Sequence, residues 1–250
     1  MSDHFSWARG GPAIAAREAI LGGILGPLMD AYTRRRIIGR DVLAGIAPPV
    51  LFVANHCSHM DTPSLLRALP GAWRRRTAVA AAADYFYRKP VLAAAVSLAF
   101  NTVSIERRTD AALTDVASNL DRLLDEDSSL VIFAEGTRSR NGTIGRLHSG
   151  AALLATEHEL PIVPVHVSGT HAVMPPGRPW MRWRGGGVLP RRHPIEIRFG
   201  PPIRPRAGEH RTEVMERVRL FFAASGAATT PDKRIVARAR TTRDGTQLIG

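Results

Sequence analysis

The amino-acid sequence predicts an α/β fold in which helices flank a central sheet that is mostly parallel or mixed. Short apolar runs with strand character alternate along the chain with longer segments that carry helical signals, and this alternation is typical of a largely parallel sheet. Two of the runs, residues 49–54 and 129–133, are almost wholly apolar, as expected for strands buried on both faces. With 250 residues, 44% of them hydrophobic, the chain can bury the core of one such domain.

The N-terminal segment is predicted to be a helix over residues 13–33. Its middle is almost wholly apolar, and an arginine cluster at 34–36 follows directly. Such a helix can lie in a membrane interface with the arginines at anionic headgroups, or it can pack over the core of its own domain; the pattern leaves both open. Arg17, Glu18 and Asp30 interrupt the apolar run, so we do not expect a membrane-spanning helix, which needs about eighteen or more apolar residues in a row.

The rest of the chain divides into predicted strands and helices. Strands are expected at residues 36–39, 49–54, 77–83 (where the alanines also allow a helix), 102–105, 129–133, 161–167 and 195–199. Helices are expected at residues 62–69, with Thr62 as the N-cap, and at 90–99, from 109 through Leu124, at 150–159 and at 209–222. We therefore expect a membrane-associating helical segment over residues 1–36, a domain over residues 37–222 and a basic, mobile tail over residues 223–250.

The charge of the chain points to an anionic partner. The formal net charge is +12, and Lys89 and Lys233 are the only lysines, so arginine carries nearly all of the positive charge. This balance favours nucleic acid, an anionic membrane surface or a phosphorylated substrate, and the planar arginine fork suits phosphate. Because the sequence has no aromatic and basic nucleic-acid signature, we expect no nucleic-acid partner. Cys57 is the sole cysteine, which excludes an intramolecular disulfide and zinc-ribbon spacing.

The first candidate site residues, His56 and Asp61, follow the strand at 49–54. Residues five apart lie about 140° apart on a helix, so the pair can meet only across a turn between strand and helix. Histidine is the side chain best suited to take a proton near neutral pH, and a carboxylate can orient its ring. The pair therefore predicts a general base, His56, supported by Asp61, with the nucleophile supplied by a hydroxyl or amine of the substrate.

Three other interpretations of this stretch stay open. A histidine in a turn often does no more than satisfy backbone groups. Metal binding by His56, Cys57, His59 and Asp61 is an alternative, although their spacing matches no zinc motif, and we expect no metal. Cys57 could be a nucleophile with His56 as its base, but neighbours at a strand end point to opposite sides, so we expect Cys57 to be a packed residue.

Two further stretches follow predicted strands. After the strand at 129–133, Glu135 can accept a substrate hydroxyl, Gly136 permits close backbone approach, and Arg138 offers a phosphate-binding fork. After the strand at 102–105 comes Arg107. Ligands of open α/β sheets collect beyond the carboxyl ends of the strands, so these side chains predict a site for a phosphorylated acceptor, with a plain polar loop as the alternative for each of them.

These stretches resemble the sequence blocks of the glycerolipid acyltransferases, the superfamily that contains lysophosphatidic acid acyltransferase. Residues 55–61 resemble the NHxxxxD block, 101–107 the GxxxIxR block, 133–139 the FPEGTRS block and 160–165 the apolar, proline-interrupted fourth block. All four occur in the family order. Asn101 stands where the second block has glycine, and Ala134 stands where the third block has proline.

The resemblance implies acyl transfer from an acyl thioester, either acyl-CoA or acyl carrier protein, to the hydroxyl of 1-acylglycerol 3-phosphate, which gives phosphatidic acid without a cofactor. His56 would remove the acceptor proton and Asp61 would support it. The substrate-binding residues that the resemblance implies are Arg107 and Arg138 for the phosphate, Glu135 for placing the acceptor, and Gly136 and Thr137 beside them. It also implies a peripheral protein at the cytoplasmic face of the cell membrane. The sequence indicates no oligomeric state.

Several alternatives to this function remain at the level of the sequence. The acceptor could instead be glycerol 3-phosphate, another lysophospholipid or a lyso-aminolipid. A non-catalytic basic protein that binds anionic lipid or nucleic acid is the alternative from another class. The loop at 171–194 carries Trp180 and Trp183 among arginines, which is typical of a membrane interface, although tryptophans folded back on the core would give the same pattern.

Overall fold

The computed structural model describes residues 6–82, 90–105, 121, 123–185 and 191–229. Seven strands form one sheet in the order β1-β7-β6-β2-β5-β3-β4. The strands are β1 (Thr33–Ile38), β2 (Leu51–Ala54), β3 (Thr77–Ala82), β4 (Thr102–Ile105), β5 (Ser129–Phe133), β6 (Ile162–Ser168) and β7 (His193–Phe199). Strands β2 to β6 run parallel, β7 is antiparallel to β6, and β1 pairs parallel with β7. The predicted α/β class with a mostly parallel, mixed sheet is confirmed.

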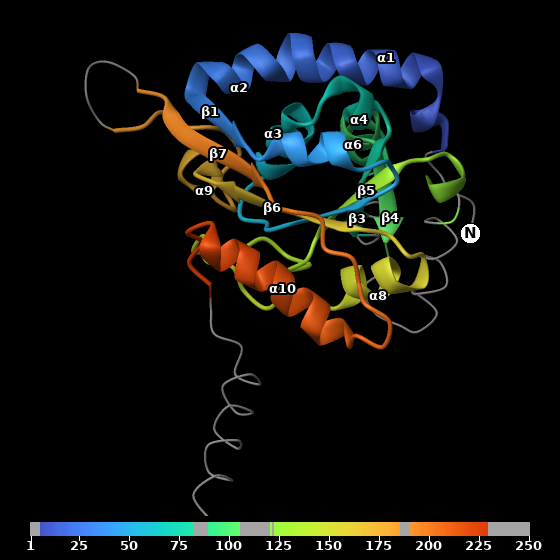
Figure 1. The fold of residues 1–250 in the computed structure, drawn as a ribbon. Coiled ribbons are helices and arrows are strands. Elements are labelled where there is room, and N and C mark those ends of the chain that lie inside the picture. The colour runs from blue at the N-terminus through green and yellow to red at the C-terminus, as the bar shows by residue number, and fades with distance from the viewer. Residues whose placement is uncertain (1–5, 83–89, 106–120, 122, 186–190, 230–250) are drawn as a thin grey trace, which may run out of the picture.

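Helices cover both faces of this sheet (Figure 1). On one face lie α3 (Asp61–Ala68), α4 (Gly71–Arg75), α6 (Pro90–Phe100) and the N-terminal helix, and on the other lie α8 (Gly150–Glu157) and α10 (Arg211–Ala224). The position of the central strand β2 between two layers of helices explains why its sequence is apolar throughout. Leu51 and Val53 belong to the hydrophobic cluster on the α8 and α10 side, whereas Phe52 and Ala54 belong to the cluster on the opposite side. Successive strand residues point to opposite faces, so a strand covered twice needs no polar residue.

The N-terminal helix is continuous from Gly11 to Tyr32, as α1 (Gly11–Ala19), a π-helical segment (Ile20–Leu25) and α2 (Gly26–Tyr32). It is long and apolar enough to cross a membrane, by length and composition, and it lies along the domain (Figure 1). Its π-helical segment contains Gly22 and Gly23, where the intrinsic helix propensity is low.

The polar interruptions of this helix hold it on the domain. Arg17 is buried and donates to the backbone oxygens of Leu98 and Ala8 at 3.0 and 2.6 Å. Glu18 accepts two hydrogen bonds from Arg74, at 2.8 and 2.6 Å, and Asp30 pairs with Arg67 in the same way. The opposite side of the helix is open, and Ile24 is 62% exposed there. The helix therefore packs over its own domain on one side only.

Most predicted elements are present within a few residues of their expected ends, including the strand β3. The predicted N-cap at Thr62 is wrong, because α3 begins at Asp61 and Met60 is its N-cap residue. The reason is that the Asp61 carboxylate turns back to accept the N–H groups of Cys57 and Ser58, so the N-cap lies two residues earlier than predicted. The predicted helix from 109 lies largely outside the described residues, as does the tail from 230 onwards. The short helices α4 and α9 (Thr170–Val173) were not predicted.

Candidate active site

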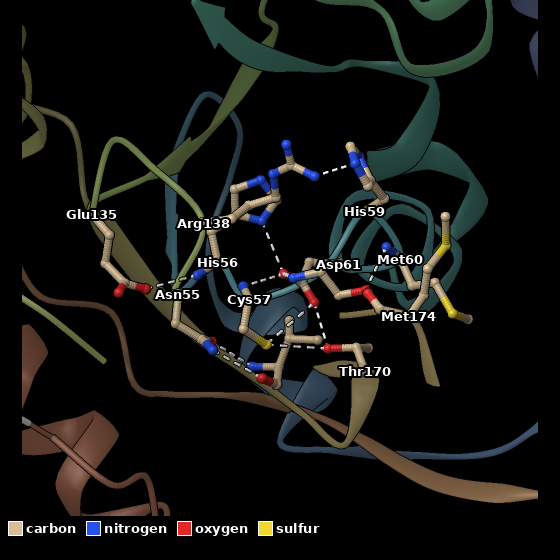
Figure 2. A network of polar contacts seen from close by, with 12 residues as sticks. Asn55, His56, Cys57, His59, Met60, Asp61, Glu135, Arg138, Thr170 and Met174 are labelled. Atoms are coloured by element: carbon tan, nitrogen blue, oxygen red, sulfur yellow. Dashed lines mark hydrogen bonds and ion pairs between the residues drawn. The ribbon is translucent and has the colours of Figure 1, made fainter. Parts of the chain in front are cut away.

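The candidate site lies where three neighbouring parallel strands end. Strands β6, β2 and β5 are adjacent in the sheet. Thr170, His56 and Glu135 each come two residues after the last residue of their strand, Ser168, Ala54 and Phe133. Parallel strands bring their carboxyl ends to the same edge, so three segments far apart in the sequence contribute to one cluster (Figure 2).

The predicted pair of His56 and Asp61 is formed. His56 Nδ1 lies 2.9 Å from Asp61 Oδ2, and the Asp61 side chain is fully buried. An ionised carboxylate only accepts hydrogen bonds, so Nδ1 carries the proton and Nε2 keeps its lone pair. No described residue is hydrogen-bonded to Nε2, and the His56 side chain is 20% exposed. The ring stacks on Phe133 with centroids 4.1 Å apart. This arrangement presents a basic nitrogen at an open position.

The Asp61 carboxylate is held from several directions. Its Oδ2 also accepts the backbone N–H groups of Cys57 and Ser58, at 2.6 and 2.8 Å. Its Oδ1 accepts the hydroxyl of Thr170 at 2.5 Å. These donors satisfy the oxygens of a buried carboxylate and fix its position beside the histidine.

Asn55 joins the ends of β2 and β6. Its side-chain amide donates to the Val167 carbonyl at 2.9 Å and accepts the Val167 N–H at 2.8 Å. A buried side chain that satisfies both backbone groups of a neighbouring strand fixes the register of the two strand ends. This asparagine therefore sets where His56 stands relative to the segment that follows β6.

Glu135 is buried, and its carboxylate accepts hydrogen bonds from two backbone N–H groups. Its Oε1 accepts the N–H of His56 at 2.9 Å and its Oε2 accepts the N–H of Gly145 at 2.9 Å. Burial raises the pKa of Glu135, and the two backbone donors oppose that rise. The structure gives Glu135 a role in positioning His56; its contact with an acceptor hydroxyl stays a prediction.

Of the two predicted phosphate-binding residues, the structure describes Arg138 but not Arg107. The Arg138 guanidinium contacts His59 Nε2, and the N–H of Ser139 donates to the His56 carbonyl at 2.8 Å, so this loop is tied to the base. Burial, and next the charge of Arg138, lower the pKa of His59, which favours a neutral ring able to accept from the guanidinium. Arg107 lies outside the described residues, and β4, which precedes it, is three strands away from β2 in the sheet.

The loop between Glu135 and Arg138 is shaped by Gly136 and Thr137. Gly136 has a φ of +66°, a conformation that glycine adopts without strain. Thr137 is exposed. The structure thus places Gly136 as a turn residue and leaves the Thr137 side chain accessible beside the site.

The structure also bears on two alternatives for this stretch, a nucleophilic Cys57 and a metal site. Cys57 is buried, and burial, followed by the charge of Asp61, raises the pKa of its thiol to about 12, so it stays protonated at neutral pH and is a poor nucleophile. Two of the four candidate metal ligands face other partners, since His59 contacts Arg138 and Cys57 Sγ lies 3.4 Å from Thr170 Oγ1. In the described part of the chain, no group of three or more His, Cys, Asp or Glu side chains could hold a metal ion.

Sequence reasoning missed Thr170. It follows Gly169, whose φ is +82° and where a Cβ atom would lie 2.2 Å from the Pro194 carbonyl oxygen, so only glycine fits. The signal was present in Ser168-Gly169-Thr170, because this polar segment directly follows an apolar strand of the fourth block. A hydroxyl at that strand end could have been expected to reach the same edge as His56.

Comparisons with known proteins identify the family of the chain. Residues 34–168 match the family model described as Acyltransferase. A 1-acyl-sn-glycerol-3-phosphate acyltransferase of Limnanthes douglasii is 31% identical over 154 residues, which cover 61% of this chain and 50% of the relative. The human 1-acyl-sn-glycerol-3-phosphate acyltransferase beta is 32% identical over 120 residues, covering 48% and 41%. The chain spans about half the length of the curated relatives it matches.

A solved structure shares the fold. The crystal structure of the 1-acyl-sn-glycerophosphate (LPA) acyltransferase PlsC from Thermotoga maritima superimposes with a TM-score of 0.55 at 19% identity, over 83% of this chain and 76% of that one. The matched family segment runs from β1 through β6 and contains His56, Asp61 and Glu135. The chain therefore belongs to the acyltransferase family, and within it resembles the 1-acylglycerol-3-phosphate acyltransferases.

Proposed function

We propose that this protein transfers a fatty acyl group from an acyl thioester, acyl-CoA or acyl carrier protein, to the free hydroxyl of 1-acylglycerol 3-phosphate, giving phosphatidic acid. The observation that carries the proposal is the buried Asp61 bonded to His56 Nδ1, with His56 Nε2 left open. The activity for which the relatives are named supports the choice of acceptor. No nucleophilic side chain is required, because the acceptor supplies its own hydroxyl.

The proposed mechanism uses His56 twice. His56 Nε2 takes the proton of the acceptor hydroxyl as that oxygen attacks the thioester carbonyl, and Asp61 stabilises the imidazolium that forms. The tetrahedral intermediate then breaks its carbon–sulfur bond, and the proton passes from His56 to the departing sulfur. One ester and one free thiol result, and the histidine returns to its starting state.

The acceptor phosphate is proposed to bind at Arg138, with Arg107 as a second cation. The Arg138 guanidinium lies on a loop tied to His56 through the Ser139 N–H. His59 in its neutral form can hold that guanidinium without competing with a phosphate for it. A doubly charged phosphate monoester suits such a fork through paired, charge-assisted hydrogen bonds.

We propose that the protein works at the cytoplasmic face of the membrane as a peripheral protein. The N-terminal helix is tied to the domain through Arg17, Glu18 and Asp30, and spanning a bilayer would break these contacts. Its outer side exposes Ile24, and Trp183 stacks on Tyr32 at its end with centroids 4.3 Å apart.

This membrane-facing surface combines apolar and basic side chains. Trp180 and Trp183 are 55% and 39% exposed, and Arg34 and Arg36 are exposed next to the helix end. Tryptophan and arginine favour the interface of an anionic bilayer. Replacing both tryptophans by alanine should weaken binding to anionic vesicles, whereas Leu220→Ala, on α10 of the opposite layer and 55% exposed, should not. Unchanged binding of the double variant would contradict this part of the proposal.

The activity is tested with the purified protein. Acyl-CoA and acyl carrier protein donors are offered against 1-acylglycerol 3-phosphate, glycerol 3-phosphate, other lysophospholipids and a lyso-aminolipid, with His56→Ala as the control. We expect transfer to 1-acylglycerol 3-phosphate and a loss of about a hundredfold or more in the His56→Ala variant, the usual contribution of a general base. Preference for another acceptor would overturn the substrate assignment. Near-normal turnover in His56→Ala would overturn the mechanism, and salt-sensitive DNA binding without any transfer would favour the non-catalytic alternative.

A further inference from the structure

The two oxygens of the Asp61 carboxylate face different surroundings. Oδ2 is occupied by three donors that come from its own turn, His56 Nδ1 and the N–H groups of Cys57 and Ser58. Oδ1 has one close donor, the hydroxyl of Thr170 at 2.5 Å, and the Cys57 thiol is farther away at 3.9 Å. Thr170 is fully buried. The orientation of the carboxylate about its own bond to Cβ therefore depends on a residue more than a hundred positions later in the chain.

The direction of the hydrogen bond between Thr170 and Asp61 is fixed by the chemistry of the groups. An ionised carboxylate cannot donate, so the Thr170 O–H must point at Asp61. The Cys57 thiol, 3.4 Å from Thr170 Oγ1, stays protonated because its pKa is raised to about 12. It can therefore donate to the threonine oxygen while the threonine donates to the carboxylate.

The segment that carries Thr170 is held rigidly at both ends. Before it, Asn55 bonds both backbone groups of Val167. After it, the hydroxyl of Ser58 donates to the Met174 carbonyl at 2.8 Å. Asn55 and Ser58 lie on either side of His56 and Cys57 in the chain, so these hydrogen bonds hold the short helix α9 against the same turn that carries the base.

We infer that Thr170 is a positioning residue of the acyl transfer reaction, acting through Asp61 to fix the orientation and charge of the carboxylate that supports His56. The inference rests on the proposed function, because it assigns a role within that mechanism. Thr170 is fully buried, and its role is assigned through Asp61 rather than through contact with a substrate. Its hydroxyl holds Oδ1 so that Oδ2 stays directed at His56 Nδ1 throughout the proton transfer.

Matched variants separate the hydroxyl from the shape of the side chain. Thr170→Val keeps the volume and removes the donor, whereas Thr170→Ser keeps the donor and removes a methyl group. We expect Thr170→Val to lower kcat by about 10- to 100-fold, the range for losing one hydrogen bond to a buried charge. The KM values of donor and acceptor should change little, and Thr170→Ser should stay within about threefold of the wild type, since it keeps the hydrogen bond.

Two further readouts distinguish positioning from general loss of structure. The acid limb of the pH–rate profile should shift in Thr170→Val and stay in place in Thr170→Ser, because only the first alters the charge environment of the base. The His56 Nδ1–H proton resonance, followed by nitrogen-15 labelling, should likewise move only in Thr170→Val. If the valine variant does not fold, Thr170→Ala takes its place, because the smaller side chain leaves room for a water molecule.

The outcomes separate this inference from the proposed function. Wild-type kcat and an unmoved His56 resonance in Thr170→Val would overturn the inference while leaving the acyltransferase activity standing. Equal losses in the valine and serine variants would also overturn it, because the methyl group would then be the important part. If the wild type transferred no acyl group, the proposed function would fail, and the resonance would still decide whether Thr170 positions the pair.

Discussion

The most decisive perturbation of the proposed mechanism is Asp61→Asn, which removes one charge at a buried position and almost no volume. The carboxylate oxygen Oδ2 accepts three hydrogen bonds, whereas Oδ1 accepts one, from Thr170. An asparagine therefore fits best with its carbonyl oxygen in the place of Oδ2 and its amide nitrogen facing Thr170, whose hydroxyl can rotate to accept. The geometry around His56 survives, and only the negative charge is lost.

The size of the effect follows from the charge that develops on His56. In the transition state an imidazolium forms beside the carboxylate, whose Oδ2 lies 2.9 Å from Nδ1. Two unit charges with centres about 4 Å apart attract by about 4 kcal/mol at an effective dielectric constant of about 20. That energy corresponds to a rate factor of about a thousand. In the proposed mechanism the histidine enters the reaction as a neutral base, so the ground state loses far less.

The assay compares kcat and KM for wild type, Asp61→Asn and Asp125→Asn, the last being the same chemical change at an exposed position. We expect kcat of Asp61→Asn to fall about a thousandfold with KM values within about threefold, the pattern of an interaction made only in the transition state. The double variant with His56→Ala should be no slower than His56→Ala alone, because Asp61 acts through His56. A loss of less than about tenfold in a folded Asp61→Asn protein would refute the reasoning, since it would mean that the buried charge does not support the base.

Two further predictions concern buried groups around the pair. Cys57→Ser should retain activity within a few fold, and iodoacetamide should alkylate Cys57 only after unfolding, because burial raises the pKa of the thiol to about 12; rapid alkylation of the folded protein or an inactive serine variant would contradict this. Burial raises the pKa of Glu135, so the folded state favours the neutral form of this side chain. The stability that Glu135 contributes through this shift is complete below the unfolded pKa of about 4.3, and it is lost as the pH rises through the folded pKa. The free energy of unfolding of wild type relative to Glu135→Gln, measured by urea denaturation, should therefore fall from pH 4 upwards, and a difference that stays constant or rises would contradict the assignment.

The fold class could be predicted because it depends on local pattern. The run from Leu51 to Ala54 is apolar at every position, and in the structure its side chains enter two hydrophobic clusters, one on each face of the sheet. Alternation of such runs with helical segments is enough to indicate a largely parallel sheet. The antiparallel placement of β7 beside β6 and the pairing of β1 with β7 could not be predicted. Local pattern does not fix the direction of a strand, and β1 and β7 come from distant parts of the chain.

The turn at His56 shows where sequence reasoning lost accuracy. Thr62 followed by proline is typical of a helix start, yet α3 begins at Asp61. The carboxylate of Asp61 binds the backbone of its own turn at Cys57 and Ser58. A propensity rule weighs each residue by itself and does not count such a competing use of a side chain.

By itself, the sequence indicated several of the residues that come together at His56 and the chemistry expected of them. The order of the strands and the residue types at their ends predicted a base, a supporting carboxylate and a cation, since parallel strands end at one edge. Only the tertiary structure decided how each group is used. It bonds Glu135 to the backbone of His56, places His59 beside Arg138, and brings Thr170 to Oδ1 of Asp61. The physical reason is that a buried polar atom must find a partner, and which partner is within reach depends on the packing of segments that are distant in the chain.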